Sequence, residues 1–325
     1  MHIESIPVLR GRKKAAWSAL LAKCGLEESS AESTVLVWEG DELIATGSRE
    51  GSILKCIAVD DGHQGEGLTA TVLTRLRQEA FEAGESKLFL YTKPRNESRF
   101  TPLLFHPIAK TGKVLLMEDD VRGIRRFLSS LPAPEGECGC IVMNADPFTL
   151  GHRYLAVAAA KQCENLLIFV LSEDRGHVPA ADRLELVKRG TADIPNVSVL
   201  PTGPYLISSA TFPTYFLKDR DDAQEVQCML DVEIFARYYA PHFRITRRFV
   251  GTEPLSNLTA RYNEVLKTHL PPRGIAVTEL KRLERSGIPI SASAVRKALD
   301  VGDRDTVRSL VPPTTYHYFF KEDTP

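Results

Sequence analysis

From residue 137 onward, apolar strand-like runs alternate with helix-like stretches, and this alternation constrains the fold more than any other feature of the chain. Strands are predicted at 140–143, 166–171, 197–200, 245–251 and 275–279, and helices at 151–163, 180–191, 223–238, 258–269 and 291–299. Such alternation predicts a parallel sheet with helices on both faces. Ligands bind these sheets beyond the carboxyl ends of the strands, so functional residues are expected in the loops that follow strands.

The residues before this region are organised differently. Strands are predicted at 34–38, 42–46, 52–59 and 87–91, and apolar residues at helical spacing predict a helix at about 67–83. A segment rich in proline, glycine and acidic residues, 131–137, separates the two patterns and is typical of a linker. We therefore expect an α/β protein with two domains, an α+β domain at 1–132 and a parallel-sheet domain at 137–325.

Composition excludes several classes of protein. Hydrophobic residues make up 43% of the 325 residues, enough to build cores, so disorder is excluded as the main state. The 41 Lys and Arg residues balance 42 Asp and Glu residues, which argues against nucleic acid as a partner. Apolar runs are far shorter than a membrane span, and the first residues lack the apolar block of a signal peptide. Six irregularly spaced cysteines fit a reducing compartment, so a soluble cytoplasmic protein is expected.

The most informative segment is 143–152, which leaves the first strand of the second domain and opens a helix. The start of a helix presents free backbone N–H groups and the positive end of the dipole, which suits phosphate. Gly151 permits close approach of a ligand, and Pro147 fixes the turn. Thr149 and His152 lie three residues apart, so both can point at one anion. A turn with a capping histidine is the simpler alternative.

A second segment, 288–296, stands near the end of the chain. Ser291 and Ser293 precede a helix whose first turn ends in Arg296. By itself this pattern is explained equally well by a helix N-cap and a solvated charge. Its combination with the Thr149–His152 turn is much less expected by chance.

Together the two segments resemble the nucleotidylyltransferase superfamily, whose members transfer AMP or CMP from a nucleoside triphosphate. The resemblance implies that Thr149 and His152 contact the triphosphate, and that Ser291, Ser293 and Arg296 hold the β- and γ-phosphates. Further ATP-binding candidates in the two strand-following loops are Asn144, Pro147, Phe148, Gly151, Gly251, Thr252 and Glu253. No residue set is marked out as a metal cage, so Mg²⁺ is expected to be carried by phosphate oxygens.

In the first domain, a glycine-rich turn between a strand and a helix resembles the pyrophosphate loop of GNAT acyltransferases. Gln64 and Gly67 match that pattern, Gly65 lies between them at an unrestricted position, and Thr69 departs from it, since Gly or Ala is usual there. Backbone N–H groups of this loop can cradle a pyrophosphate. A purely structural glycine-rich turn remains the alternative. The resemblance implies a GNAT-like first domain.

Several ordered blocks narrow the resemblance further. They are 172–174, 182–188, 202–208, 210–216 and 250–254. This succession is similar to the citrate lyase ligases, over nearly the whole chain. The resemblance implies that acetate and ATP form acetyl-AMP and pyrophosphate. The acetyl group would then pass to the thiol of a CoA-like prosthetic group on the citrate lyase acyl carrier protein.

Two other functions stay open. One is a nucleotidylyltransferase acting on a phosphorylated acceptor, and the other is a GNAT acetyltransferase whose second domain senses nucleotide. Among single residues, His177 is placed on the expected ligand side. Arg183 and Lys188 share a helix that could border the phosphates, and a solvated helix face is the default expectation for both. The cysteines lack the partner spacing of a zinc site, so no metal ligands are predicted among them.

Overall fold

The computed structural model describes residues 1–174, 176–206, 212, 214–217, 220–254, 256–285 and 287–320. Contacts divide the chain into two compact units: Met1–Ile124 with Phe212–Leu230, and Arg125–Thr211 with Asp231–Pro325. The first division falls a few residues before the boundary predicted at 132–137, and the return of 212–230 to the first unit was not predicted. Residues 207, 208, 210, 211 and 213, which belong to the blocks at 202–208 and 210–216, lie outside the described residues.

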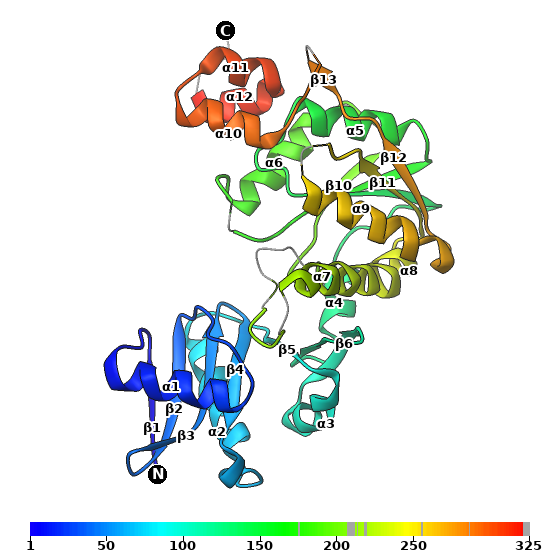
Figure 1. The fold of residues 1–325 in the computed structure, drawn as a ribbon. Helices are drawn as coiled ribbons and strands as arrows, with labels where there is room; N and C mark the ends of the chain where they lie inside the picture. Colours follow the sequence, from blue (N-terminus) through cyan, green and yellow to red (C-terminus); the bar gives the residue numbers. More distant parts are fainter. Residues whose placement is uncertain are drawn as a thin grey trace. The chain divides into compact units, whose positions relative to one another are not determined.

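Seven strands form the sheet of the first unit, in the order β1-β2-β3-β4-β5-β7-β6 (Figure 1). They are β1 (His2–Ile6), β2 (Ser33–Glu39), β3 (Glu42–Glu50), β4 (Ile53–Val59), β5 (Phe89–Thr92), β6 (His106–Lys110) and β7 (Leu115–Glu118). All neighbours are antiparallel except β4 and β5, which pair in parallel at Ile53↔Phe89 and Leu54↔Leu90. The predicted strands of this domain are confirmed, and β1, β6 and β7 are additional.

Helix α2 (Leu68–Glu82) packs its apolar stripe against this sheet, as its residue spacing predicts. The approach is close at Gly47 on β3, where a Cβ would lie 2.5 Å from Cγ1 of Val72. Glycine is required there because any side chain would push α2 away from the sheet. The other helical elements are α1 (Gly11–Lys23), η1 (Asp61–His63), η2 (Pro94–Asn96), α3 (Glu97–Phe100) and η3 (Thr101–Leu103).

The short stretch of described residues at 214–217 is built into the first unit, although it follows β10 (Val197–Pro201) in the sequence. The Tyr215 hydroxyl donates to the carbonyl oxygen of Tyr91 at 3.1 Å, and the N–H of Glu27 donates to the carbonyl of Tyr215 at 2.7 Å. Tyr215 and Phe216 are buried. These bonds tie the stretch to the end of β5, and α7 (Arg220–Ile234) follows it.

The second unit contains the predicted parallel sheet, in the order β10-β9-β8-β11-β12. Its other strands are β8 (Cys138–Met143), β9 (Asn165–Val170), β11 (Ile245–Gly251) and β12 (Ala276–Leu280). Every pairing in it is parallel. The carboxyl ends of the strands therefore share one edge, where the loops after β8, β9 and β11 start.

Both faces of this sheet are covered. On β9, Leu166, Ile168 and Val170 pack in the cluster that includes helices α5 (Leu150–Ala160) and α6 (Ala180–Gly190). Phe169, which points to the opposite face, contacts the rings of Tyr239 and Phe243. A strand buried on both faces explains why β9 reads as a continuous apolar run and not as an alternating one.

The remaining helical elements of the second unit are α4 (Gly123–Ser129), η4 (Phe235–Tyr239), α8 (Ala240–His242), α9 (Asn257–His269), η5 (Pro271–Arg273), α10 (Ala292–Asp300), α11 (Arg304–Leu310) and α12 (Pro313–Phe320). The short strands β13 (Glu284–Arg285) and β14 (Ile288–Pro289) form a hairpin directly before α10. Helices α10, α11 and α12 share a small core around Val295 and Val307. The hairpin thus leads directly into α10.

Candidate active site

The turn between β8 and α5 is organised by its own side chains. The Thr149 hydroxyl accepts a hydrogen bond from the N–H of His152 at 3.3 Å, and the N–H of Thr149 donates to Nδ1 of His152 at 3.1 Å. The two residues thus form a reciprocal capping box at the start of α5. The predicted cap is therefore present, and contact of these residues with a triphosphate stays a prediction. The Thr149 hydroxyl also lies 3.0 Å from Nδ1, so Nε2 is the ring nitrogen that can meet a ligand.

The His152 ring is held in place and electrically neutral. It stacks on the ring of Phe148, with centroids 5.9 Å apart and planes 13° apart. Burial and the nearby positive charge of Arg282 lower the pKa of His152 to about 4. A neutral ring that accepts at Nδ1 carries its proton on Nε2. The ring can therefore donate one hydrogen bond to an anion at neutral pH.

The segment that carries Ser291 lies against this turn. A Cβ at Gly151 would come within 3.0 Å of the carbonyl oxygen of Ile290, the residue before Ser291. Ser291 caps α10, since its hydroxyl accepts from the N–H of Ala294 at 3.2 Å. Arg296 reaches the same turn, where its guanidinium donates to the carbonyl oxygen of Asp146. Two stretches about 140 residues apart in the sequence thus meet.

Asp146 contacts each of the segments that come together here, and sequence reasoning did not select it. Its carboxylate accepts from the N–H of His177 at 3.1 Å and from the N–H of Val178 at 2.9 Å. It also lies 3.8 Å from the guanidinium of Arg296 and 3.7 Å from Nδ1 of His177. Its position directly before Pro147 in a strand-following loop was the available signal. Asp146 links the loops after β8 and β9 to α10.

Arg183 is a structural clamp, contrary to the solvated helix face expected for it. It is almost fully buried at 1% exposure. Its guanidinium donates to the carbonyl oxygen of Asn144 at 2.8 Å, to that of Val178 at 3.1 Å and to that of Glu173. A buried arginine needs such partners to offset its desolvation. It fixes the loops after β8 and β9 to each other, whereas Lys188 is exposed as expected.

A third group lies at the end of β11, where Gly251, Thr252 and Glu253 were predicted to contact ATP. The Thr252 hydroxyl accepts from the N–H of Arg282 at 3.1 Å, and the Arg282 guanidinium pairs with Glu253. Gly251 lies beneath Arg282, since a Cβ there would be 3.7 Å from Cγ of that residue. Sequence reasoning missed Arg282, whose only signal was its position just after the last strand of the sheet.

The predicted site residues therefore divide into inner and outer positions. Thr149 and Phe148 are buried at 1% and 0% exposure, so they hold His152 and do not face open space. Asn144 in the turn and Ser293 at the start of α10 are exposed, and the Ser293 hydroxyl accepts from Arg296 at 3.1 Å. The Asp146–Pro147 peptide bond is cis, with both residues buried.

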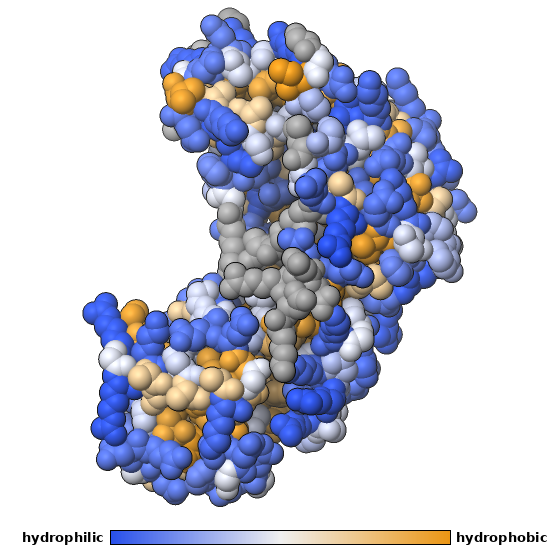
Figure 2. Space-filling view, viewed as in Figure 1, coloured by the Kyte–Doolittle hydropathy of each residue, from blue (hydrophilic) through white to orange (hydrophobic). Residues whose placement is uncertain are grey.

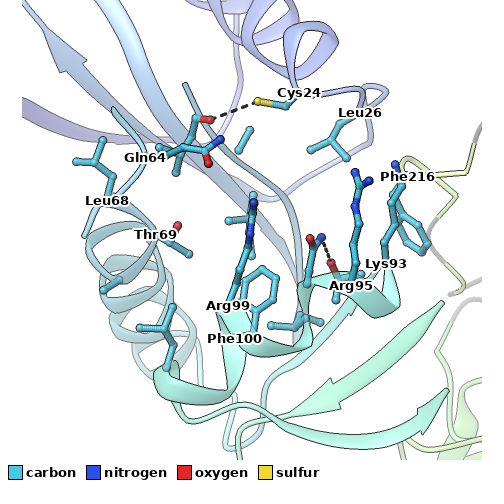
Figure 3. Close-up of a pocket in the computed structure, with 18 of the residues that line it drawn as sticks. Cys24, Leu26, Gln64, Leu68, Thr69, Lys93, Arg95, Arg99, Phe100 and Phe216 are labelled. Carbon is cyan, nitrogen blue, oxygen red and sulfur yellow. Dashed lines mark hydrogen bonds between the residues drawn. The ribbon is translucent and has the colours of Figure 1, made fainter. Parts of the chain in front are cut away.

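The glycine-rich loop of the first unit belongs to a different site. Gln64, Gly65, Gly67 and Thr69 line a pocket of about 890 Å³ whose lining residues all lie in that unit (Figure 3). Gly65 and Gly67 have φ angles of +92° and +78°, and a Cβ on either would meet open space. The Gln64 amide donates to Asp61 at 2.7 Å. The loop is thus held at its start and exposes its backbone toward the pocket.

The surface of the first unit carries both apolar and hydrophilic residues. In Figure 2, apolar residues gather in the middle of the visible face at the lower left, and hydrophilic residues surround them. The pocket lining has the same mixture, since it combines the polar loop with apolar side chains such as Leu68 and Phe100. A ligand of this pocket should therefore carry both polar and apolar groups.

The cysteines are ordinary thiols. None of the six, which all belong to the described residues, forms a disulfide. Burial is the largest influence on the pKa of Cys24, which lines the pocket, and it raises that pKa. Among the described residues, no group of three or more His, Cys, Asp or Glu side chains is arranged to hold a metal ion. In the same part of the chain, none of the helices has the length and apolar character needed to cross a membrane.

A parallel sheet whose first strand leads into a histidine-bearing helix start, met by a serine–arginine helix start, defines an α/β domain with its candidate site at the carboxyl ends of the strands. The model of the citrate lyase ligase C-terminal domain matches residues 138–319. The chain is 40% identical to [Citrate [pro-3S]-lyase] ligase of Escherichia coli over 90% of this chain and 85% of that protein. The chain is 41% identical to the Klebsiella pneumoniae protein of that name, over 90% of this chain and 88% of that protein. The chain belongs to the citrate lyase ligase family.

Other similarities cover parts of the chain. A phosphopantetheine adenylyltransferase of Dehalococcoides mccartyi is 41% identical over 56 residues, 17% of this chain and 35% of that protein. The crystal structure of Thermotoga maritima TmcAL bound with alpha-thio ATP has a TM-score of 0.36 at 15% identity, covering 57% of this chain and 56% of that one. The structure of Escherichia coli ElaA has a TM-score of 0.33 at 11% identity, covering 37% of this chain and all of that one.

Proposed function

We propose that this chain activates acetate with ATP and passes the acetyl group to the prosthetic-group thiol of the citrate lyase acyl carrier protein. Membership of the citrate lyase ligase family supports this overall reaction. The single structural observation that carries the proposed chemistry is the contact of Arg296 with Asp146 in the turn that leads into His152. That contact supports one polyphosphate site built from both segments.

The first step is attack of an acetate oxygen on the α-phosphorus of ATP. A new O–P bond forms, the bond to the β-phosphate oxygen breaks, and pyrophosphate leaves with the bonding electrons. Negative charge grows on the leaving group and on the α-phosphoryl oxygens. Fixed donors aimed at that charge lower the barrier without having to reorganise. The N–H groups at the start of α5, Nε2 of His152 and the guanidinium of Arg296 are those donors.

Thr149 and Asp146 act through their neighbours in this scheme. Thr149 holds the His152 ring through Nδ1, which leaves Nε2 for the substrate. Asp146 holds Arg296. Ser291 and Ser293 stand at the start of α10, whose N–H groups favour the β- and γ-phosphates. Adenine and ribose would lie along Gly251, Thr252 and Glu253.

Mg²⁺ is the expected companion of ATP, and the residues present suit a metal carried by phosphate oxygens and water. The carboxylate in the turn before α5, Asp146, already accepts from two backbone N–H groups and pairs with Arg296. It therefore fits a positioning role better than that of a metal ligand. When bound, the metal would neutralise charge on the leaving pyrophosphate.

The second step consumes the acetyl adenylate. The sulfur of the carrier thiol attacks the acetyl carbon, an S–C bond forms, the C–O bond to AMP breaks, and the thiol proton is released. The first-unit pocket supports this step, because its loop suits the diphosphate of a CoA-like arm. Thr69 adds a β-branched side chain at a loop position where Gly or Ala is usual. We assign the pocket to the arm and not to the adenylation chemistry.

Isotope exchange tests the first step. The chain is incubated with ATP, Mg²⁺ and labelled pyrophosphate, with or without acetate and without carrier protein. We expect label to enter ATP only when acetate is present. Absence of acetate-dependent exchange would overturn the proposal.

The short match to a phosphopantetheine adenylyltransferase favours one competing function, adenylyl transfer to a phosphate ester. The same assay with 4′-phosphopantetheine in place of acetate examines it. Exchange that needs the phosphate ester and ignores acetate would support this second function. Exchange with acetate alone would exclude it as the main activity.

A further inference from the structure

The first-unit pocket has an excess of positive charge opposite its glycine-rich loop. Its lining includes four Lys or Arg side chains (Lys23, Lys93, Arg95 and Arg99) and one carboxylate, Asp61. Lys23 is paired with Asp60, outside the lining. Asp61 accepts from the Gln64 amide. The positive charge available to a ligand therefore lies in the segment after β5, on η2 and α3, which we call the arginine wall.

Arg95 and Arg99 are two exposed arginines that line the pocket on this side. They lie four residues apart along η2 and α3, so they share one face. Figure 3 shows both extending into the pocket, on the side opposite Leu68 and Thr69. Among the residues that the structure describes, neither makes a hydrogen bond or ion pair with a carboxylate, and both are exposed.

The wall that carries them is anchored. The side-chain amide of Asn96 donates to the hydroxyl of Thr92 at 2.8 Å, which ties η2 to the end of β5. Phe100, at the end of α3, is buried in the core of the unit at 7% exposure. The two guanidinium groups therefore project from a fixed base. A fixed pair of guanidinium groups is suited to a phosphoryl group, which accepts several charge-assisted hydrogen bonds.

The strands β4 and β5 contribute apolar groups to the lining of the pocket. Ile57 and Val59 on β4 and Tyr91 on β5 lie along it, beyond the point where Leu54 pairs with Leu90. Phe216 also lines it. Such a lining suits a flexible arm of methylene and amide groups. A ligand that spans the pocket would thus meet backbone N–H groups at the loop and guanidinium groups on the opposite wall.

We propose that Arg95 and Arg99 form a second phosphate subsite, which binds a phosphoryl group at the nucleotide end of the CoA-like arm other than its diphosphate. The proposal rests on the proposed function, which places the arm in this pocket. It adds a specificity: the pocket distinguishes arms by the number and position of their phosphoryl groups. The glycine-rich loop and the arginine pair would bind two separate phosphate groups of one ligand.

The test compares two soluble probes, coenzyme A and 3′-dephospho-coenzyme A, which share the arm and the diphosphate and differ by one phosphoryl group. Their affinities for the full chain are measured by titration calorimetry. We expect the wild type to bind coenzyme A about tenfold to a hundredfold more tightly, because the extra group gains charge-assisted hydrogen bonds. This preference should weaken with added salt.

The double variant Arg95→Gln/Arg99→Gln should lose the preference. Its affinity for coenzyme A should fall to that for the dephospho form, and its affinity for the dephospho form should change less than about twofold, since the diphosphate loop is untouched. Arg122→Gln, an exposed arginine of the same unit outside the pocket, is the matched control and should keep the wild-type ratio. If the double variant does not fold, each single variant is measured in the same way.

Equal affinity of the wild type for the two probes, or an unchanged ratio in the variants, would overturn the subsite. Acetate-dependent pyrophosphate exchange, measured on the same preparations, reports on adenylation and requires no thiol. Exchange that persists while the ratio fails would reject the subsite alone. A ratio that behaves as expected while exchange is absent would reject the proposed function and leave a phosphate-selective pocket.

Discussion

Each unit contains a turn with a glycine that leads from a strand into a helix. The two turns differ in what surrounds the glycine and in how the helix is capped. In the second unit, Gly151 is approached by the chain itself, since a Cβ there would lie 3.0 Å from the carbonyl oxygen of Ile290. In the first unit, Gly67 has a φ of +78°, and a Cβ there would have no neighbour within 4 Å. One glycine permits close packing, and the other permits a left-handed backbone.

The difference extends to the side chains. The start of α5 is capped by Thr149 and His152, which bond to each other. The start of α2 has Gly67 as its N-cap and no side-chain cap. Backbone N–H groups at a helix start that have no acceptor within the protein can donate to water or to a ligand. The comparison indicates a preorganised catalytic turn in one unit and an open binding loop in the other.

Removing the imidazole from the preorganised turn should have the largest effect. His152→Ala deletes the Nε2 donor, so acetate-dependent exchange of pyrophosphate into ATP should fall by about two to four decades. Folding should be nearly unaffected, since the cap loses one of its two reciprocal bonds, worth about 1 kcal/mol. His317→Ala is the matched control, because that residue is exposed on α12, outside the candidate site. Exchange near the wild-type rate in His152→Ala would remove this residue from the mechanism.

Arg282 should rank second, because it influences the same ring through its charge. Its positive charge helps to lower the pKa of His152, so Arg282→Gln should raise that pKa above its present value of about 4. Burial is the larger cause, so the pKa should stay below the ordinary value of 6.5. NMR titration of the His152 ring measures the shift directly. Loss of the neutral ring on acidification would begin at a higher pH in the variant.

Exchange activity supplies the second measurement for Arg282. Removing the guanidinium that pairs with Glu253, beside the proposed ribose site, should lower the rate by about tenfold to a hundredfold. Lys281→Gln is the control, since that side chain is 78% exposed and adjacent in sequence. An unchanged pKa of His152 would show that Arg282 does not act on the ring.

Periodicity predicted the main elements of the catalytic unit well. The strand predicted at 245–251 has the observed bounds, and the helix predicted at 180–191 ends one residue earlier, at Gly190. These elements are long and apolar, so local pattern and tertiary packing agree. In the first unit α1 was missed, since its charged sequence has only three buried residues, Trp17, Leu20 and Leu21.

The candidate site was predicted by residue type and only partly by role. Motif spacing selected His152, Ser291 and Arg296, whose segments do meet. It could not select Asp146 or Arg282, because their importance arises from long-range contacts that spacing along the chain does not encode. The buried Arg183 shows the same limit: a helix face that looks solvated in sequence is covered by loops from elsewhere. The ligands, Mg²⁺ and the cytoplasmic location stay predictions.

Gly151→Ala tests whether close packing organises the catalytic turn. The added Cβ would press on the Ile290 carbonyl and displace the segment that carries Ser291. Exchange should fall about tenfold, since small misplacements of catalytic groups are costly. Stability should change by less than about 1 kcal/mol, because alanine favours the helix and offsets part of the contact. Wild-type exchange in this variant would show that the approach of Ile290 is not needed.

Gly67→Asp should give the smallest effect, confined to the open loop. Both Gly67→Asp and Gly67→Asn bring strain at a φ of +78°, and only the first adds a negative charge at the proposed diphosphate site. The affinity for the carrier protein should therefore be about fivefold lower in the Asp variant than in the Asn variant, from roughly 1 kcal/mol of repulsion. Acetate-dependent exchange should be equal in the two. Equal carrier affinities would assign the loop a structural role, whereas a difference that disappears at high salt would identify charge as its cause.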